Sequence, residues 1–123
     1  MKENRTTVYL KYKGHCAYCG REIKIEEMQI DHLTPKCLGH FYKSNVMKES
    51  VNAKGDNVNS FENQMPSCRR CNHYKLAYRL EDFRNLMKSL HERISQNYIN
   101  KVALDFGIME LKPFDGTFYF EKN

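Results

Sequence analysis

The sequence has no long apolar run, and this absence removes whole classes of function. No stretch of the 123 residues approaches the ~18 apolar residues that a membrane-spanning helix needs. The first residues, MKENRTTVYLKYKGHC, contain no apolar block of the kind found in signal peptides. We therefore expect a cytoplasmic protein with no membrane partner. No internal repeat is visible either, and the length predicts a single domain over residues 1–123.

The chain also lacks an acidic excess. It has 20 Lys and Arg residues against 15 Asp and Glu residues, which gives a formal net charge of +5 at pH 7. A basic balance suits a polyanionic partner such as a nucleic acid, although many soluble proteins reach this charge. A domain of this size buries only a modest hydrophobic core, so an additional stabilising cross-link is expected.

Four of the five cysteines supply a candidate for this cross-link. They form two pairs with two-residue spacing, Cys16-Ala-Tyr-Cys19 and Cys68-Arg-Arg-Cys71. In a reducing compartment such spacing is typical of metal binding, and four thiolates make a closed, tetrahedral, structural zinc site. Thiol-redox pairs stay open as an alternative, although neither pair lies in a βαβ pattern. The odd residue, Cys37, is expected to be a free loop cysteine.

The order of patterns along the chain predicts an α+β fold. Residues 5–13 are either a short strand or a helix, and we favour the helix. Residues 23–33 alternate imperfectly, as expected of a bulged or hairpin-like strand that ends before Pro35. Residues 36–60 are rich in Lys, Asn, Ser and Gly and show no sustained period. We interpret them as a long surface loop, and loops of that length often carry function.

After the second cysteine pair the pattern becomes helical. Apolar residues recur at intervals of three or four and predict a core-facing stripe: Leu80, Phe83, Met87, Leu90, Ile94 and Tyr98. Helix is expected to continue or restart as far as Phe106, with Gly107 as its cap. Around Asp115-Gly116 the sequence predicts a terminal β-hairpin, whose aromatic residues 118–120 should pack back onto the domain.

Chemistry is suggested by Asp31 and His32 in the segment QIDHLTPKC. A histidine is partly neutral at cellular pH and can act as a general base, while a carboxylate suits Mg²⁺ or Mn²⁺. Neighbours on a strand point to opposite faces, so a catalytic ion at this position would need a second ligand from a helix. Asn72, directly after the second cysteine pair, is the predicted second ligand, and His73 stays open as the alternative.

Basic residues gather around the second cysteine pair. Arg69, Arg70, Lys75 and Arg79 are close in sequence to the predicted ligand Asn72. Their clustering predicts contacts with nucleic-acid phosphates, whereas the simpler interpretation of each residue is a solvated charge on a helix.

Taken together, these motifs resemble the HNH endonuclease family. The shared pattern is a C-x-x-C, then D-H-L-x-P beginning at Asp31, then Asn63 five residues before a second C-x-x-C, which is followed by N-x-x-K beginning at Asn72. Members of this family have a ββα-metal fold, and the chain is similar to the version with four zinc-binding cysteines. The resemblance covers about residues 12–75, and the extension at about 79–123 matches only loosely.

The resemblance implies roles for particular residues. His32 would be the general base, and Asp31 and Asn72 would bind the catalytic Mg²⁺ or Mn²⁺. Asn63 matches the central Asn of the family, whose side chain ties a loop to the strand and holds the base in position. Lys75 matches the basic residue that follows.

The expected function is therefore metal-dependent hydrolysis of DNA phosphodiester bonds, and the resemblance implies 5′-phosphate and 3′-hydroxyl ends. A non-catalytic, zinc-stabilised nucleic-acid-binding module is the alternative from another class. RNA stays open as a substrate. Two copies of the chain, or a partner subunit that provides specificity, stay open as assemblies, because no recognition element is evident in the sequence.

Overall fold

The computed structural model describes residues 2–34 and 59–122, which form parts of two compact units. The first unit takes in Met1–Leu80 and Phe118–Asn123, and the second takes in Glu81–Thr117. Most of the loop predicted at residues 36–60, including Cys37, lies outside the described residues.

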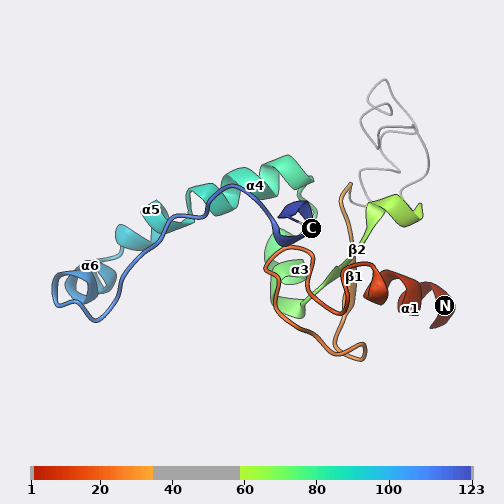
Figure 1. The fold of residues 1–123 in the computed structure, drawn as a ribbon. Coiled ribbons are helices and arrows are strands. Elements are labelled where there is room, and N and C mark those ends of the chain that lie inside the picture. The colour runs from red at the N-terminus through yellow and green to blue at the C-terminus, as the bar shows by residue number, and fades with distance from the viewer. Residues whose placement is uncertain (1, 35–58, 123) are drawn as a thin grey trace, which may run out of the picture. The chain divides into compact units, whose positions relative to one another are not determined.

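The first unit has a small α+β fold with a two-stranded antiparallel sheet. Its two strands lie side by side (Figure 1), and Gln29 pairs with Ser67 at one end and His32 with Gln64 at the other. Helix α3 begins two residues after β2 ends and contacts β1. The elements in chain order are α1 (Lys2–Leu10), β1 (Gln29–His32), the 3-10 helix η2 (Phe61–Asn63), β2 (Gln64–Ser67), α3 (Arg69–Lys75) and the 3-10 helix η3 (Tyr119–Lys122).

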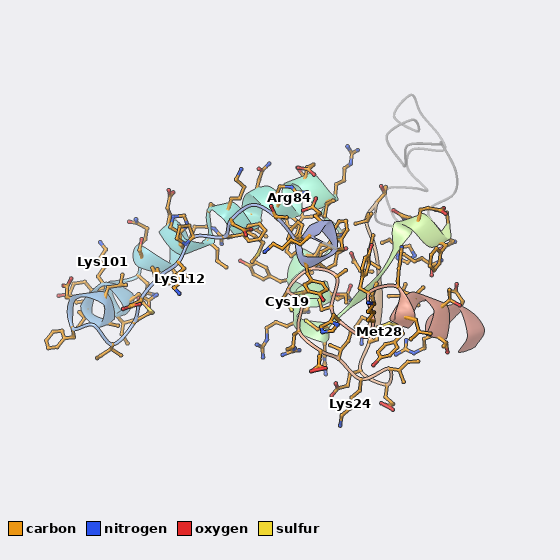
Figure 2. The ribbon with its side chains drawn as sticks, in the orientation of Figure 1. Cys19, Lys24, Met28, Arg84, Lys101 and Lys112 are labelled. Atoms are coloured by element: carbon orange, nitrogen blue, oxygen red, sulfur yellow. The ribbon has the colours of Figure 1, made fainter. Side chains whose placement is uncertain are left out.

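Helix α1 covers the turn that leads into β1, which confirms the helix predicted near residues 5–13. Val8 on α1 is fully buried, and Met28, labelled in Figure 2, is only 1% exposed. The guanidinium of Arg5 donates to the carbonyl oxygens of Ile25 at 2.7 Å and Met28 at 2.6 Å. Since those carbonyls bond to Arg5, this segment forms a turn and the strand is shorter than predicted.

The predicted terminal β-hairpin is wrong. Within the described residues 106–122 no strand forms. The side chain of Asp115 instead accepts a hydrogen bond from the backbone N–H of Thr117 at 2.9 Å, a local turn that competes with strand pairing. The chain then enters η3 rather than returning as a strand.

The aromatic tail packs back onto the first unit, as predicted, and its contacts are with the first cysteine pair. Phe118 is 2% exposed, and its ring meets that of Tyr18 edge-on with 5.5 Å between centroids. The backbone N–H of Phe120 donates to the carbonyl of Ala17 at 2.8 Å. Gly20 is necessary beside this tail, because its φ is +81° and a Cβ there would lie 2.5 Å from the ring of Tyr119.

The second unit consists mainly of short helices. Their bounds are α4 (Leu80–Lys88), α5 (Leu90–Ser95) and α6 (Tyr98–Asp105). The predicted apolar stripe is only partly correct, because Phe83 is 2% exposed whereas Tyr98 is 81% exposed. The stripe breaks where Asn97 caps α6, its side chain accepting from the N–H of Ile99. Gly107 ends this helical segment as predicted, with a φ of +71° directly after Phe106, the C-cap of α6.

Among the described residues, no helix has both the length and the apolar character needed to cross a membrane.

Candidate functional site

The four paired cysteines meet in one cluster, as predicted. Their sulfur atoms all lie within 4.8 Å of one another, and the Sγ atoms of Cys19 and Cys68 are 3.9 Å apart. A tetrahedral zinc ion with Zn–S bonds of about 2.3 Å holds its sulfur ligands about 3.8 Å apart. The cluster is therefore compatible with a structural Zn²⁺ site. A single cluster of four also argues against two separate redox pairs.

Local backbone geometry brings the two pairs together. In the first pair, the N–H of Gly20 returns to the carbonyl of Cys16 at 3.0 Å and closes a tight turn. In the second pair, Cys68 is the N-cap of α3, and its sulfur accepts from the N–H of Cys71 at 3.4 Å. The start of α3 is thereby fixed to the cysteine cluster.

Three of the four thiols, those of Cys16, Cys19 and Cys71, have pKa values shifted by their neighbours. Hydrogen bonds from the thiols of Cys19 and Cys71 lower the pKa of Cys16, against the opposing effect of burial. The pKa of Cys71 is raised by the hydrogen bonds of this thiol to Cys16 and Cys19 and by burial. Zinc binds thiolates, so binding of Zn²⁺ would displace the thiol protons and zinc affinity should fall as the pH falls.

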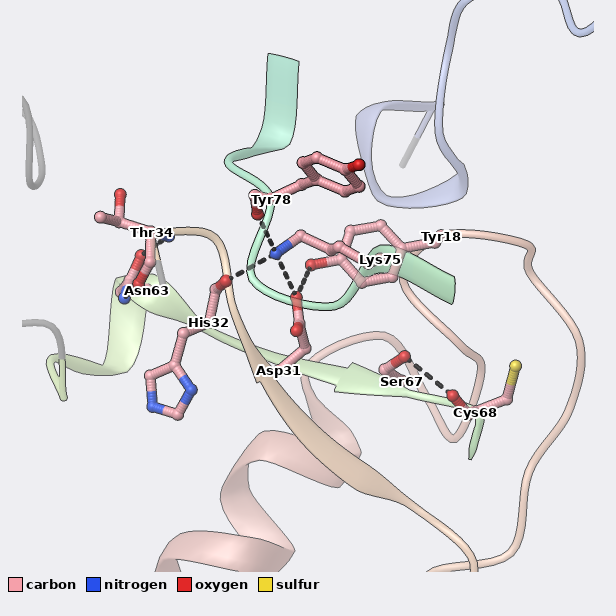
Figure 3. A network of polar contacts seen from close by, with 9 residues as sticks. All are labelled: Tyr18, Asp31, His32, Thr34, Asn63, Ser67, Cys68, Lys75 and Tyr78. Carbon is pink, nitrogen blue, oxygen red and sulfur yellow. Dashed lines mark hydrogen bonds and ion pairs between the residues drawn. The ribbon is translucent and has the colours of Figure 1, made fainter. Parts of the chain in front are cut away.

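Asp31 and His32 lie side by side on β1 but have different surroundings. Asp31 is 5% exposed, whereas His32 is only half-buried. Figure 3 shows the carboxylate of Asp31 directed toward Tyr18 and Lys75 and the imidazole of His32 directed away from them. The alternation expected of neighbours on a strand is therefore present at this pair.

A buried polar network surrounds the Asp31 carboxylate. Its Oδ2 atom accepts a short hydrogen bond from the hydroxyl of Tyr18 and pairs with the Nζ of Lys75 at 3.0 Å (Figure 3). Burial, followed by the charge of Asp31, raises the pKa of Tyr18 well above its ordinary value. Tyr18 therefore remains a protonated donor to Asp31 across the physiological range.

Lys75 is fully buried, and this corrects its predicted contact with phosphate. Besides Asp31, its Nζ donates to the carbonyl oxygens of His32 and Tyr78, each at 2.9 Å. An ammonium has three N–H donors, and these three acceptors satisfy all of them. No donor of Lys75 is left for a nucleic acid in this arrangement.

Asn63 is bound to the segment that follows His32. Its Oδ1 accepts from the N–H of Thr34 at 2.8 Å, and its Nδ2 donates to the carbonyl of Thr34 at 3.0 Å. The backbone carbonyl of Asn63 also accepts from the N–H of Leu33 at 3.0 Å. The side chain therefore joins the end of β1 to the start of β2, which is the kind of contact that the resemblance implied for it.

The remaining predicted residues lie on or just after α3. Asn72 is half-buried and His73 is exposed. Arg69 and Arg70 are exposed in the first turn, so both remain candidates for phosphate contacts. Arg79 is half-buried and already makes a contact of its own.

Sequence reasoning missed two participants in this site. Tyr18 lies within the first C-x-x-C, where its spacing gave no sign of a bond to Asp31. Tyr78 contributes through its backbone carbonyl, which no side-chain motif reveals. Apart from this site, Arg21 is exposed after the first cysteine pair and lines a hollow of about 340 Å³ together with Arg69. Glu26 and Glu27 line the same hollow and would oppose an anion.

The donors available for a catalytic divalent ion are few but of the right type. The hydrogen bond and ion pair of Asp31 both fall on Oδ2, so Oδ1 is the oxygen that would bind a metal. Asn72 precedes Lys75 by three residues, a spacing that places both on one face of a helix. One carboxylate and one amide oxygen fit Mg²⁺, which keeps several waters and takes further oxygens from a substrate phosphate.

Comparisons with other proteins give no relative for this chain. No protein-family model matches it, and neither does any curated protein or solved structure. The case for a function therefore rests on the chemistry of the site itself.

Proposed function

We propose that the first unit is a metal-dependent endonuclease similar to the HNH nucleases, and that it hydrolyses phosphodiester bonds in DNA. The observation that carries this proposal is that hydrogen bonds from other segments fix the backbone at the end of β1. The carbonyl of His32 is bound by Lys75, and the following Thr34 is bound by Asn63. Such contacts suit a side chain that must meet its reactant in a fixed geometry.

In this mechanism His32 is the general base. Its neutral imidazole accepts a proton from a water molecule as the water oxygen bonds to phosphorus. The bond from phosphorus to the 3′ oxygen breaks, and the leaving oxygen takes a proton from solvent, which gives 5′-phosphate and 3′-hydroxyl ends. A Mg²⁺ or Mn²⁺ ion held by Asp31 and Asn72 would stabilise the charge that develops on the phosphate and the leaving oxygen.

The exposed arginines Arg69 and Arg70 would hold the DNA backbone. Arg69 and Arg70 begin α3, which also carries Asn72 and Lys75. Contacts of this kind act on phosphates and carry no base information, so they predict affinity that falls as salt rises.

A second candidate, the non-catalytic binding module, is favoured by one observation. The ion pair between Asp31 and Lys75 uses the carboxylate within the fold. In that case zinc and the arginines would serve binding alone.

Supercoiled plasmid separates the two functions. We expect the zinc-loaded wild type to nick or linearise the plasmid with Mg²⁺ or Mn²⁺ and to stop when EDTA is present, with zinc content measured before and after. Plasmid that stays supercoiled under all metals while the protein still retards it would establish the binding module instead.

Asn72 and His73 make a matched pair for testing the second metal ligand. We expect Asn72→Ala to lower the cleavage rate at limiting Mg²⁺ and to recover partly at high Mg²⁺, because one ligand of the ion is lost. His73→Ala should cleave like the wild type, because His73 lies on a different helix face from Lys75. The reverse result, with the Mg²⁺ dependence changed only by His73→Ala, would assign the ligand to His73.

A further inference from the structure

Lys75 is the least expected feature of this site. Lysine is almost never fully buried unless it is paired, and Lys75 is buried at 0% exposure with a complete set of acceptors. One acceptor is a carboxylate and two are backbone carbonyls. The two carbonyls belong to segments that lie on either side of α3 in the chain, the end of β1 and the turn after α3.

The turn after α3 is shaped to complete this arrangement. Leu76, at the C-cap of α3, has a φ of +52°, a left-handed conformation that is unfavourable for a residue with a branched side chain. It reverses the chain so that the N–H of Tyr78 bonds to the carbonyl of Lys75 at 3.1 Å, while the carbonyl of Tyr78 accepts from Nζ. Strain of this kind persists where the surrounding contacts require it.

His32 is the last residue of β1, where ladder hydrogen bonds end. Its backbone is nevertheless held on both sides. The N–H of the next residue, Leu33, bonds to the carbonyl of Asn63. The carbonyl of His32 accepts from Lys75 (Figure 3). The direction of a side chain depends on the φ and ψ angles of its residue, so these bonds help to set where the imidazole can go.

We propose that Lys75 is the positioning residue for His32. The buried ammonium of Lys75, neutralised by Asp31, donates a hydrogen bond to the carbonyl of His32 and thereby orients the imidazole toward the attacking water. This inference rests on the proposed nuclease function. Lys75 acts through the backbone and touches neither substrate nor the reacting atoms. Its partner Asp31 neutralises it through Oδ2 and leaves Oδ1 facing elsewhere.

The effect expected of Lys75→Met is a loss of turnover without a loss of binding. Misplacing a reacting group by about 1 Å can cost roughly 10²-fold in rate, and we expect kcat to fall by that order while KM and DNA affinity stay unchanged. The matched control is Lys24→Met, which removes an exposed lysine of the same unit and should change neither kcat nor KM.

The carbonyl of His32 can also be observed without any cleavage assay. The dipeptide His-Leu occurs once in the sequence, at His32-Leu33, so labelling with ¹³C′-His and ¹⁵N-Leu gives a single correlation in an HNCO spectrum. Loss of the hydrogen bond from Lys75 should move that ¹³C′ resonance upfield in Lys75→Met. Lys24→Met should leave it in place.

The outcomes are separable. Three results with folded, zinc-loaded Lys75→Met would overturn the positioning role. They are a wild-type kcat, a raised KM in place of a lowered kcat, and an unchanged His32 carbonyl resonance. Inactive wild type overturns the nuclease and the positioning role with it, whereas active wild type with equally active Lys75→Met overturns only the latter. If Lys75→Met does not fold, Lys75→Arg keeps the positive charge beside Asp31 and should still lower kcat and move the carbonyl resonance.

Discussion

His32→Ala should lower the rate of DNA cleavage by roughly 10²- to 10⁴-fold, the range that a general base contributes. The substitution removes the imidazole but keeps the backbone carbonyl that Lys75 binds. The buried network around Asp31 and the cysteine cluster is therefore expected to survive. Rates of plasmid nicking, measured with zinc content, thermal melting and DNA affinity on the same preparations, would separate a loss of chemistry from a loss of fold.

His73→Ala is the matched control for this prediction. It removes a histidine from an exposed position on α3 and should cleave at the wild-type rate. Two results would contradict a catalytic role for His32: cleavage by His32→Ala within a few-fold of the wild type, or a loss of activity that follows a loss of zinc or of DNA binding.

The cysteine cluster could be predicted from sequence because its information is local. Each C-x-x-C pair encodes its own turn, and two such pairs have few uses in a reducing compartment other than sharing a metal. The prediction was therefore correct although Cys19 and Cys68 are far apart in the sequence, and their sulfur atoms lie 3.9 Å apart in the structure. The aromatic tail was predictable for a related reason, since Phe118 had to be covered by something.

Lys75 shows what sequence reasoning could not reach. A lysine beside two arginines suggested a basic surface, and its burial depends on acceptors from other segments of the chain. Two of those acceptors are backbone carbonyls, of His32 and Tyr78, and carbonyl positions leave no mark in a sequence. The bond of Tyr18 to Asp31 was missed because it too depends on tertiary packing.

The errors in the second half of the chain have a different cause. The spacing from Leu80 to Tyr98 is helical throughout, but periodicity does not reveal where a polar side chain will cap a new helix, as that of Asn97 does. The Asp115-Gly116 signal was real as a turn. It predicted a hairpin only on the assumption that strands flank it, whereas the residues after it bond to the first cysteine pair instead.

Removal of zinc should unfold the first unit. A structural zinc ion contributes on the order of 10–16 kcal/mol of apparent binding free energy, comparable with or larger than the ~5–15 kcal/mol that stabilises a typical domain. We expect one zinc per chain by elemental analysis. Cys71→Ser, or a strong chelator, should abolish the cooperative melting transition of the first unit and raise susceptibility to proteolysis between residues 14 and 34. Cys37→Ser is the control, because Cys37 belongs to neither C-x-x-C pair, and it should keep both zinc and melting temperature.

Zinc loss should also remove cleavage, through a definite route. The cluster fixes Cys68 at the start of α3, and α3 carries Lys75, which holds the carbonyl of His32. Zinc would thus support the base without taking part in the reaction, since four thiolates leave no coordination position for water. Addition of Zn²⁺ to the stripped wild type should restore melting and cleavage together, with Mg²⁺ present throughout. Cleavage at the wild-type rate by zinc-free protein, or full melting cooperativity in Cys71→Ser, would contradict this route from the cluster to His32.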